Sequence, residues 1–296
     1  MRAVFMGTPE FAVPTLQALI DHHEVLAVVT QPDKQRGRGK KMQFPPVKEK
    51  AVEYDIPVYQ PQRARDEEFI EELKKINPDV IVVVAYGQIL PESILNIPKY
   101  RGAAPIQWAV LDGEEKTGIT TMYMEKGLDT GDMIDKAEVV LDEKETAGSL
   151  HDKLMVLGAD LLLETLKKLE DGTAVRKKQN DEESCYAKML SKDMGQIDFT
   201  KDAKEIECLI RGMNPWPSAY TSLDGKTMKV WEADVLDRES KEEPGTIVEV
   251  TKKEIIVATG SNDLALHEIQ LAGKKRMQVQ AFLLGYQVEA GMKLGE

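Results

Sequence analysis

The sequence predicts an α/β domain built on a doubly wound, mostly parallel sheet, followed by a smaller β-barrel. A β-α-β start is the first indication: residues 2–6 are apolar, a helical pattern begins at Phe11, and residues 25–30 form a second strand. Such units usually belong to parallel sheets. The apolar, β-branched run at 80–87 is typical of a strand buried on both faces. After residue 219, short strands alternate with turns, as they do in small barrels.

Residues 1–192 are expected to form the first domain. Thr8 is placed to cap its first helix, with Pro9 at the first helical position. The run 31–46 is expected to be a polar loop, and 171–192 a surface linker. Apolar periodicity predicts further strands at 56–59, 118–124 and 139–141, and helices at 47–54, 66–76, 105–111 and 147–170.

Residues 193–296 are expected to form the second domain. A helix at 202–213 should end at Asn214-Pro-Trp-Pro217, because proline cannot continue a helix. The short and regular spacing of the strands that follow suggests a closed or half-closed barrel. These strands are expected at 220–223, 227–233, 245–250, 255–259 and 264–270.

The composition is that of a globular protein. Of its 296 residues, 42% are hydrophobic and 30% are charged. Because no apolar run reaches the ~20 residues that span a bilayer, and no signal peptide precedes the first strand, we expect a cytoplasmic protein without a membrane segment. Cys185 and Cys208 share no metal-ligand spacing, so we interpret them as free thiols and expect no metal site.

One basic segment stands out against the net charge of −12, which argues against nucleic-acid binding over the whole surface. It is Lys34-Gln-Arg36-Gly-Arg38-Gly-Lys40-Lys41. Such a segment is usually only a solvated loop. Its sign is opposite to that of the rest of the molecule, however, so it could attract a polyanion to one place.

Several motifs in a fixed order make the sequence similar to the methionyl-tRNA formyltransferases, a family of folate-dependent formyltransferases. The resemblance covers nearly the whole chain and implies a Rossmann-like sheet domain with a C-terminal OB-like barrel. The motifs that carry it are Phe5-Met-Gly-Thr-Pro9, Thr30-Gln-Pro-Asp33, Val84-Ala-Tyr-Gly-Gln-Ile-Leu-Pro91, Arg101-Gly-Ala-Ala-Pro-Ile-Gln107, Leu128-Asp-Thr-Gly-Asp132, Asn214-Pro-Trp-Pro217 and Ala272-Gly-Lys-Lys275.

The resemblance implies transfer of a formyl group from 10-formyltetrahydrofolate to the α-amine of methionyl-initiator tRNA. This reaction needs a neutral amine, stabilisation of an oxyanion and a proton for the leaving nitrogen. The matching catalytic residue is Asp129, whereas Asp132 is interpreted as structural. The resemblance places the folate at Tyr86, Gln88, Ile89 and Leu90, chiefly through main-chain contacts. Arg38 matches the family arginine that contacts the tRNA acceptor stem, and from their charge we expect Arg36, Lys40 and Lys41 beside it, and Lys274 and Lys275 in the barrel, to contact tRNA phosphates.

One segment of the family pattern is absent. Family members carry an Asn-x-His strand end followed by Ser-Leu-Leu-Pro, which supplies a catalytic Asn and His, whereas here Pro98-Lys-Tyr100 runs directly into Arg101. Roughly a dozen residues are missing, about one strand and its loop. None of the histidines has a matching context: they are His22, His23, His151 and His267.

Two explanations for this gap are open. Either the protein lacks the strand, which should cripple catalysis, or the sequence as written omits residues that the protein contains. Loss of an interior strand would expose hydrogen-bonding groups on both neighbouring strands, at a cost that few marginally stable domains could absorb. This argument favours the omission. A Cα separation of ~3.8 Å would identify Tyr100 and Arg101 as bonded neighbours.

The sequence therefore leaves three functions to compare. The first is the formyl transfer described above, by a monomer. A catalytically impaired form that still binds tRNA and folate is the second, because the Asn-x-His segment is missing. A related enzyme that formylates a sugar amine or hydrolyses the folate is the third, although the basic loop and the barrel favour tRNA.

Overall fold

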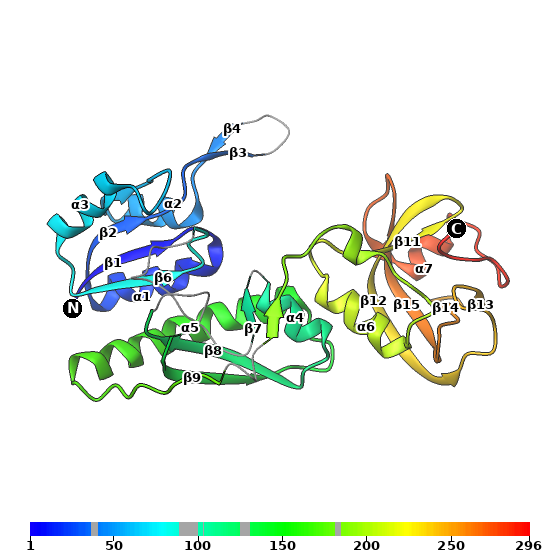
Figure 1. Cartoon of the computed structure of the whole chain (residues 1–296). Helices are drawn as coiled ribbons and strands as arrows, with labels where there is room; N and C mark the ends of the chain where they lie inside the picture. The colour runs from blue at the N-terminus through cyan, green and yellow to red at the C-terminus, as the bar shows by residue number, and fades with distance from the viewer. Residues whose placement is uncertain (37–40, 89–99, 103, 125–130, 181–184) are drawn as a thin grey trace. The chain divides into compact units, whose positions relative to one another are not determined.

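The computed structural model describes residues 1–36, 41–88, 100–102, 104–124, 131–180 and 185–296 (Figure 1). Its contacts divide the chain into two units. Unit 1 contains Met1–Arg101, Gly118–Val139 and His151–Tyr186. Unit 2 contains Gly102–Thr117, Val140–Leu150 and Ala187–Glu296. The sequence-based boundary between residues 192 and 193 stays a prediction.

Unit 1 is built on a parallel sheet with the strand order β5-β2-β1-β6. The strands are β1 (Arg2–Gly7), β2 (Glu24–Val29), β5 (Val58–Tyr59) and β6 (Val80–Val84). Side chains that alternate along β1 enter two different cores, as the period of a strand requires. Ala3 and Phe5 pack with α1 (Val13–His22), and Val4 and Met6 pack on the opposite face.

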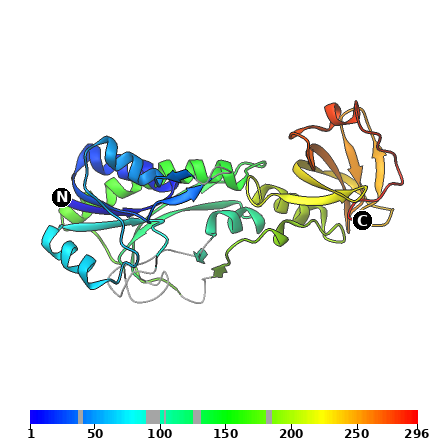
Figure 2. The same cartoon turned by 90° about the horizontal axis from the view of Figure 1, so that it is seen from above.

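Helices cover both faces of this sheet, as the mostly apolar strands require; β1 and β2 are polar only at their first residues, Arg2 and Glu24. Leu16 of α1 and Leu166 of α5 (Ala147–Glu170) belong to the core on one face. Phe69 of α3 (Glu67–Ile76) belongs to the core on the other face. Figure 2 shows α3 on the side of the sheet opposite to α1.

The carboxyl ends of three strands meet at one edge of the sheet. Met6 is in register with Val29, and Gly7 is in register with Val84. Beyond β6 the chain turns at Ala85, whose φ is 47°. Because an L-residue with that φ leaves the extended conformation, β6 ends at Val84, and the strand predicted at 80–87 was too long.

Part of the predicted polar loop is a hairpin. β3 (Lys34–Arg36) and β4 (Lys41–Gln43) pair antiparallel and extend away from the sheet of unit 1 (Figure 1). The loop prediction for 31–46 is therefore wrong at these residues. The remaining elements up to residue 187 are η1 (Glu10–Ala12), α2 (Pro46–Glu53), β7 (Tyr100–Gly102), α4 (Pro105–Leu111), β8 (Lys116–Met122), β9 (Met133–Val140) and β10 (Cys185–Ala187).

Unit 2 contains an antiparallel sheet with the order β11-β12-β15-β14-β13, and β16 pairs with β15. One face of β11 is buried at Ala219, Thr221 and Leu223, in strict alternation. The elements are η3 (Asp193–Gly195), α6 (Ala203–Gly212), β11 (Ala219–Leu223), β12 (Lys226–Glu239), β13 (Ile247–Val250), β14 (Ile255–Val257), β15 (Asn262–Leu271), β16 (Met277–Gln278) and α7 (Val279–Leu283).

The predicted fold class, a parallel α/β domain followed by an antiparallel β domain, is confirmed. The strand pairings of unit 2 follow an open order, and they are compatible with the OB-like prediction. Within the described residues, none of the helices combines the length and the apolar character needed to cross a bilayer.

Candidate functional site

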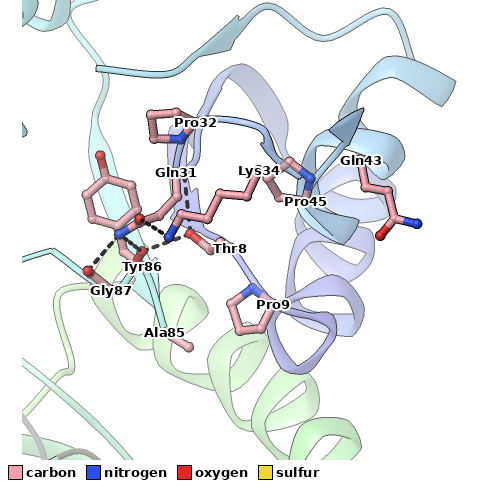
Figure 3. A pocket seen from close by; sticks show the side chains of 10 residues that line it. All are labelled: Thr8, Pro9, Gln31, Pro32, Lys34, Gln43, Pro45, Ala85, Tyr86 and Gly87. Carbon is pink, nitrogen blue, oxygen red and sulfur yellow. Dashed lines mark hydrogen bonds between the residues drawn. The ribbon is translucent and has the colours of Figure 1, made fainter. Parts of the chain in front are cut away.

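A pocket of ≈ 310 Å³ lies at the edge of the sheet where β1, β2 and β6 end. Open α/β sheets bind their ligands at this edge. The pocket is bounded by the turns that follow these strands and by the base of the β3–β4 hairpin (Figure 3). Its lining residues are Thr8, Pro9, Gln31, Pro32, Lys34, Gln43, Pro45, Ala85, Tyr86 and Gly87.

Thr8 and Gln31 hold the turn that follows β6. The Thr8 hydroxyl donates to the Tyr86 carbonyl at 2.8 Å and accepts from the Gln31 N–H at 3.3 Å. The Gln31 side-chain amide donates to the carbonyls of Tyr86 (3.4 Å) and Gly87 (2.6 Å). Thr8 therefore does not cap a helix as predicted. Pro9 precedes η1 instead, without a side-chain cap.

The side chain of Gln88 fixes the same turn from the other side. Its Oε1 accepts from the Ala64 N–H at 2.8 Å, and its Nε2 donates to the Pro61 carbonyl at 3.3 Å. Because both ends of the amide are engaged, a ligand beside Gln88 would meet its main chain rather than its side chain. Of the other predicted folate residues, Ile89 and Leu90 lie outside the described residues.

Tyr86 combines a bound carbonyl with a buried ring. Its side chain is 2% exposed and packs with Val4 and Met6. Its hydroxyl is buried and has no hydrogen-bond partner among the described residues. Burial disfavours the phenolate and raises the pKa of Tyr86 to about 12.

We expect Tyr86→Phe to reduce the loss of stability at alkaline pH. In the unfolded chain tyrosine titrates near pH ~10, so Tyr86 contributes stability that is complete below ~10 and is lost as the pH rises toward ~12. A pKa shift of this size corresponds to about 2–3 kcal/mol in the free energy of unfolding. Urea unfolding of both proteins at neutral and at alkaline pH measures this difference. If both proteins lose the same stability at alkaline pH, the ring is not buried as described.

We expect Thr8→Val to lower the free energy of unfolding by about 1–2 kcal/mol. Valine keeps the shape of threonine but leaves the Tyr86 carbonyl and the Gln31 N–H each without one partner. Thr8→Ser retains the hydroxyl and serves as the control. If the valine and serine proteins unfold at the same urea concentration, the hydroxyl does not hold this turn.

Two lysines near the base of the hairpin, Lys34 on β3 and Lys48 on α2, have different partners. Lys48 Nζ contacts both carboxylate oxygens of Asp33, at 2.7 and 2.9 Å, and Gln60 Oε1 at 2.7 Å. The hydrogen bond from Lys48 lowers the pKa of Asp33. Lys34 Nζ contacts only a neutral group in the described part of the chain, Gln31 Oε1 at 3.3 Å. Its positive charge is therefore not neutralised there.

The predicted tRNA residues fall into two groups in the structure. In the hairpin, Arg36 is in register with Lys41, whereas Arg38 and Lys40 lie outside the described residues. Lys274 and Lys275 are exposed in the turn after β15 of unit 2. Beside that turn, the Arg276 guanidinium lies 4.6 Å from the centre of the Trp231 ring. The tRNA assignments stay predictions.

The predicted catalytic residue, Asp129, lies outside the described residues. Its neighbour Asp132 is described, and its carboxylate lies 3.9 Å from Arg176. None of the four histidines lines the pocket. Within the described residues, no group of His, Cys, Asp and Glu is arranged to hold a metal ion.

Of the ten residues that line the pocket, only Tyr86 was among the predicted site residues. Gln31 follows the end of β2 at Val29, and Lys34 begins β3, at the same edge of the sheet as the predicted folate segment after β6. Because ligands bind at the carboxyl ends of parallel strands, the position of Gln31 just after the second strand is the sequence signal that indicates its role.

Comparison with known proteins gives the family. The model of the formyl transferase family matches residues 1–166, and that of the formyl transferase C-terminal domain matches 189–287. A protein of Clostridioides difficile named methionyl-tRNA formyltransferase is 56% identical to this chain over the full length of both. The chain belongs to the methionyl-tRNA formyltransferase family. A family member of Lachnospira eligens is 55% identical, again over the full length of both chains.

The fold also resembles that of a more distant solved structure. The crystal structure of WlaRD, described as a sugar 3N-formyl transferase in the presence of dTDP and 5-N-formyl-THF, superposes with a TM-score of 0.68. The match covers 93% of this chain and 99% of WlaRD, at 17% identity. The expected resemblance to methionyl-tRNA formyltransferases is thus confirmed, and the likeness to WlaRD concerns the fold alone.

The alignments also bear on the missing segment. The alignment with the Clostridioides difficile protein has 309 positions and spans all 296 residues of this chain, so about 13 positions hold no residue of it. This number agrees with the absence of roughly a dozen residues that the motifs indicate. In the structure, β7 runs through the junction of Tyr100 and Arg101. The two explanations for the gap stay alternatives.

Proposed function

We propose that the protein transfers a formyl group from 10-formyltetrahydrofolate to the α-amine of methionyl-initiator tRNA. The observation that carries this proposal is the full-length identity of 56% with a relative of that name. The pocket at the sheet edge, beside a basic hairpin, supports it. We assign catalysis to Asp129, and folate contacts to the main chain of Tyr86, Gln88, Ile89 and Leu90.

We assign different parts of this function to the two predicted domains. Residues 1–192 would bind the folate and carry the chemistry, and residues 193–296 would bind tRNA with Lys274 and Lys275. We further propose a cytoplasmic monomer that needs no metal, since Asp129 and main-chain groups supply proton transfer and polarisation. Formylation of charged initiator tRNA by the purified protein, with and without a chelator, tests this proposal.

A second candidate function is a form that binds both substrates but is impaired in catalysis. About 13 empty positions in the alignment favour it, if they correspond to the Asn-x-His segment that the family resemblance places between Tyr100 and Arg101. Inserting the corresponding residues of the Clostridioides difficile relative between Tyr100 and Arg101 tests it. A large gain in the single-turnover rate supports the impaired form, and an unchanged rate excludes it.

We expect neutralisation of the hairpin to weaken tRNA binding mainly at low salt. The change is Arg38→Gln, Lys40→Gln and Lys41→Gln in one protein. Each lost phosphate contact should lower the slope of log K against log salt by about 0.9, or roughly 2–3 in all. Filter binding over a salt series measures the slope. Lys74→Gln and Lys75→Gln on α3 remove charges elsewhere, and a similar slope change in that control would count against the assignment.

A further inference from the structure

The β3–β4 hairpin depends on its base for its position. Its two strands pair only with each other in the described part of the chain, and Met42 of β4 is 59% exposed. Isolated two-stranded hairpins are at best marginally stable in water. The direction in which this hairpin extends from the sheet of unit 1 is therefore set by contacts at the two points where it leaves the domain (Figure 1).

Lys48 of α2 contacts both of these points. Its ammonium lies 2.7 and 2.9 Å from the carboxylate oxygens of Asp33, the residue that directly precedes β3. The same Nζ lies 4.0 Å from the centre of the Phe44 ring, and Phe44 directly follows β4. A cation and the face of an aromatic ring attract each other at this distance. One side chain thus holds the hairpin on both sides of its base.

The helix that carries Lys48 is fixed in the core of unit 1. Val47 and Ala51 of α2 are fully buried, and they pack in the same core as Leu16 of α1. The Lys48 side chain therefore starts from a fixed backbone. The side chains of Lys48 and Asp33 are only 15% and 20% exposed, so solvent screens this ion pair less than it screens a fully exposed one.

The hydrogen-bond donors of Lys48 are all used within this cluster. An ammonium group has three N–H donors, and they match three acceptors: the two Asp33 oxygens and Gln60 Oε1 at 2.7 Å. Gln60 in turn donates to Asp33 Oδ1 and to the Gln31 carbonyl, both at 2.8 Å. A phosphate could reach Lys48 only by displacing one of these acceptors. The geometry favours a positioning role over direct contact with tRNA.

We propose that Lys48 is a positioning residue for tRNA binding, which together with Asp33 and Phe44 fixes the base of the hairpin and sets its direction. The inference rests on the proposed function, which assigns phosphate contacts to the basic segment of this hairpin. A hairpin that is already held in its binding orientation loses less conformational freedom on binding than one that is free to move. Lys48 and Asp33 should therefore both strengthen tRNA binding, although their charges are opposite.

Binding of uncharged initiator tRNA to two single variants tests the inference. Lys48→Met and Asp33→Asn each remove the ion pair and keep a similar side-chain volume. We expect each to weaken binding about tenfold, as loss of a hydrogen bond to a charged group would give, without changing the salt slope. A direct phosphate contact predicts a different pattern, which would overturn the inference. Lys48→Met would then lower the slope by about 0.9, and Asp33→Asn would strengthen binding by removing a negative charge.

Three further proteins complete the design. Lys48→Met combined with Asp33→Asn should bind no more weakly than the weaker single variant, because both changes remove the same interaction. Lys48→Arg keeps the ion pair and should retain most of the affinity. Lys168→Met is the control for lost stability, since it removes a lysine of α5 that lies 2.5 Å from Asp135 in unit 1, and it should bind tRNA like the wild type. Additive losses in the double variant, or an equal loss in Lys168→Met, would overturn the inference.

Trypsin cleavage gives a readout that needs no tRNA. Trypsin cuts after lysine and arginine, which segment 34–41 contains, and cutting requires local opening of the chain. Lys48→Met and Asp33→Asn should be cut in this segment several times faster than the wild type, and Lys168→Met at the wild-type rate. Equal rates in all four proteins would contradict the anchoring of the hairpin.

The two measurements separate failure of this inference from failure of the proposed function. If the cleavage rates differ as expected but the wild-type protein binds no tRNA, the proposed function fails and the anchoring of the hairpin stands. If the wild type binds tRNA and Lys48→Met and Asp33→Asn bind it equally well, only the inference fails.

Discussion

Asp129→Asn is expected to lower the single-turnover formylation rate by a factor of about 10²–10⁴, the usual contribution of one general acid–base group. A neutral amide cannot accept a proton from the attacking amine, nor return one to the leaving folate nitrogen. Asparagine has nearly the shape of aspartate, so binding of tRNA and folate should change little. Rapid quenching with enzyme in excess over charged tRNA isolates the chemical step from product release.

Asp132→Asn is the matched control for this experiment. It makes the same chemical change three residues away, at a carboxylate that faces Arg176 rather than the pocket. Its rate should stay within about threefold of the wild type, since a partly exposed ion pair at 3.9 Å contributes little. Equal losses in the two variants would contradict the assignment of catalysis to Asp129.

Arg211→Met is expected to lower the free energy of unfolding by about 3–5 kcal/mol, because it leaves a buried carboxylate without its main partner. Glu207 is 2% exposed and receives two hydrogen bonds from the Arg211 guanidinium, at 2.6 and 2.9 Å. The same guanidinium donates to the Glu145 carbonyl at 2.8 Å, which joins α6 to the segment before α5 within unit 2. Urea unfolding measures the loss.

A double variant separates the charge effect from packing. Arg211→Met with Glu207→Leu removes both charges, and it should recover most of the stability, because apolar residues of similar volume can replace a buried ion pair. Lys204 at 3.0 Å and Lys144 at 3.3 Å also face Glu207 and limit the loss in the single variant. A loss below about 1 kcal/mol would contradict the account of this cluster.

The stability that the Glu207–Arg211 pair contributes changes with pH in a definite direction. Burial alone would raise the pKa of Glu207, but the hydrogen bonds and charge of Arg211 outweigh it and lower the pKa. A depressed carboxyl pKa contributes stability that is present above the unfolded value of ~4.3 and is lost as the pH falls through the folded value. The destabilisation caused by Arg211→Met should therefore shrink in acid.

The sequence predicts well those elements whose hydrophobic pattern repeats over several residues. The strands of unit 2 show this, since alternation along β11 and β12 marks the buried face directly. The sequence did not predict the β3–β4 hairpin. Its residues are polar and basic, so the two strands pair through their main chains and bury no apolar side chains that a pattern could reveal. The early end of β6 depends on the φ of Ala85, which no residue type indicated.

Only part of the site was predicted, because the sequence reveals local motifs but not contacts between distant segments. Tyr86 and Gln88 belong to a motif of adjacent residues, and adjacency in sequence is visible without a structure. Thr8 and Gln31 act on Tyr86 from 78 and 55 residues away in the chain. Local signals assign Thr8 to a helix cap, and only the register of three parallel strands brings its hydroxyl to the Tyr86 carbonyl.

Single-turnover formylation of charged initiator tRNA tests the central claim, that this chain catalyses formyl transfer from 10-formyltetrahydrofolate. The purified protein is mixed in excess with methionyl-initiator tRNA and the folate, and N-formylmethionyl-tRNA is counted over time. We predict product at a rate well above background that falls with Asp129→Asn but not with Asp132→Asn. No product above background, from a protein that still binds both substrates, would contradict the claim and leave the impaired binding form.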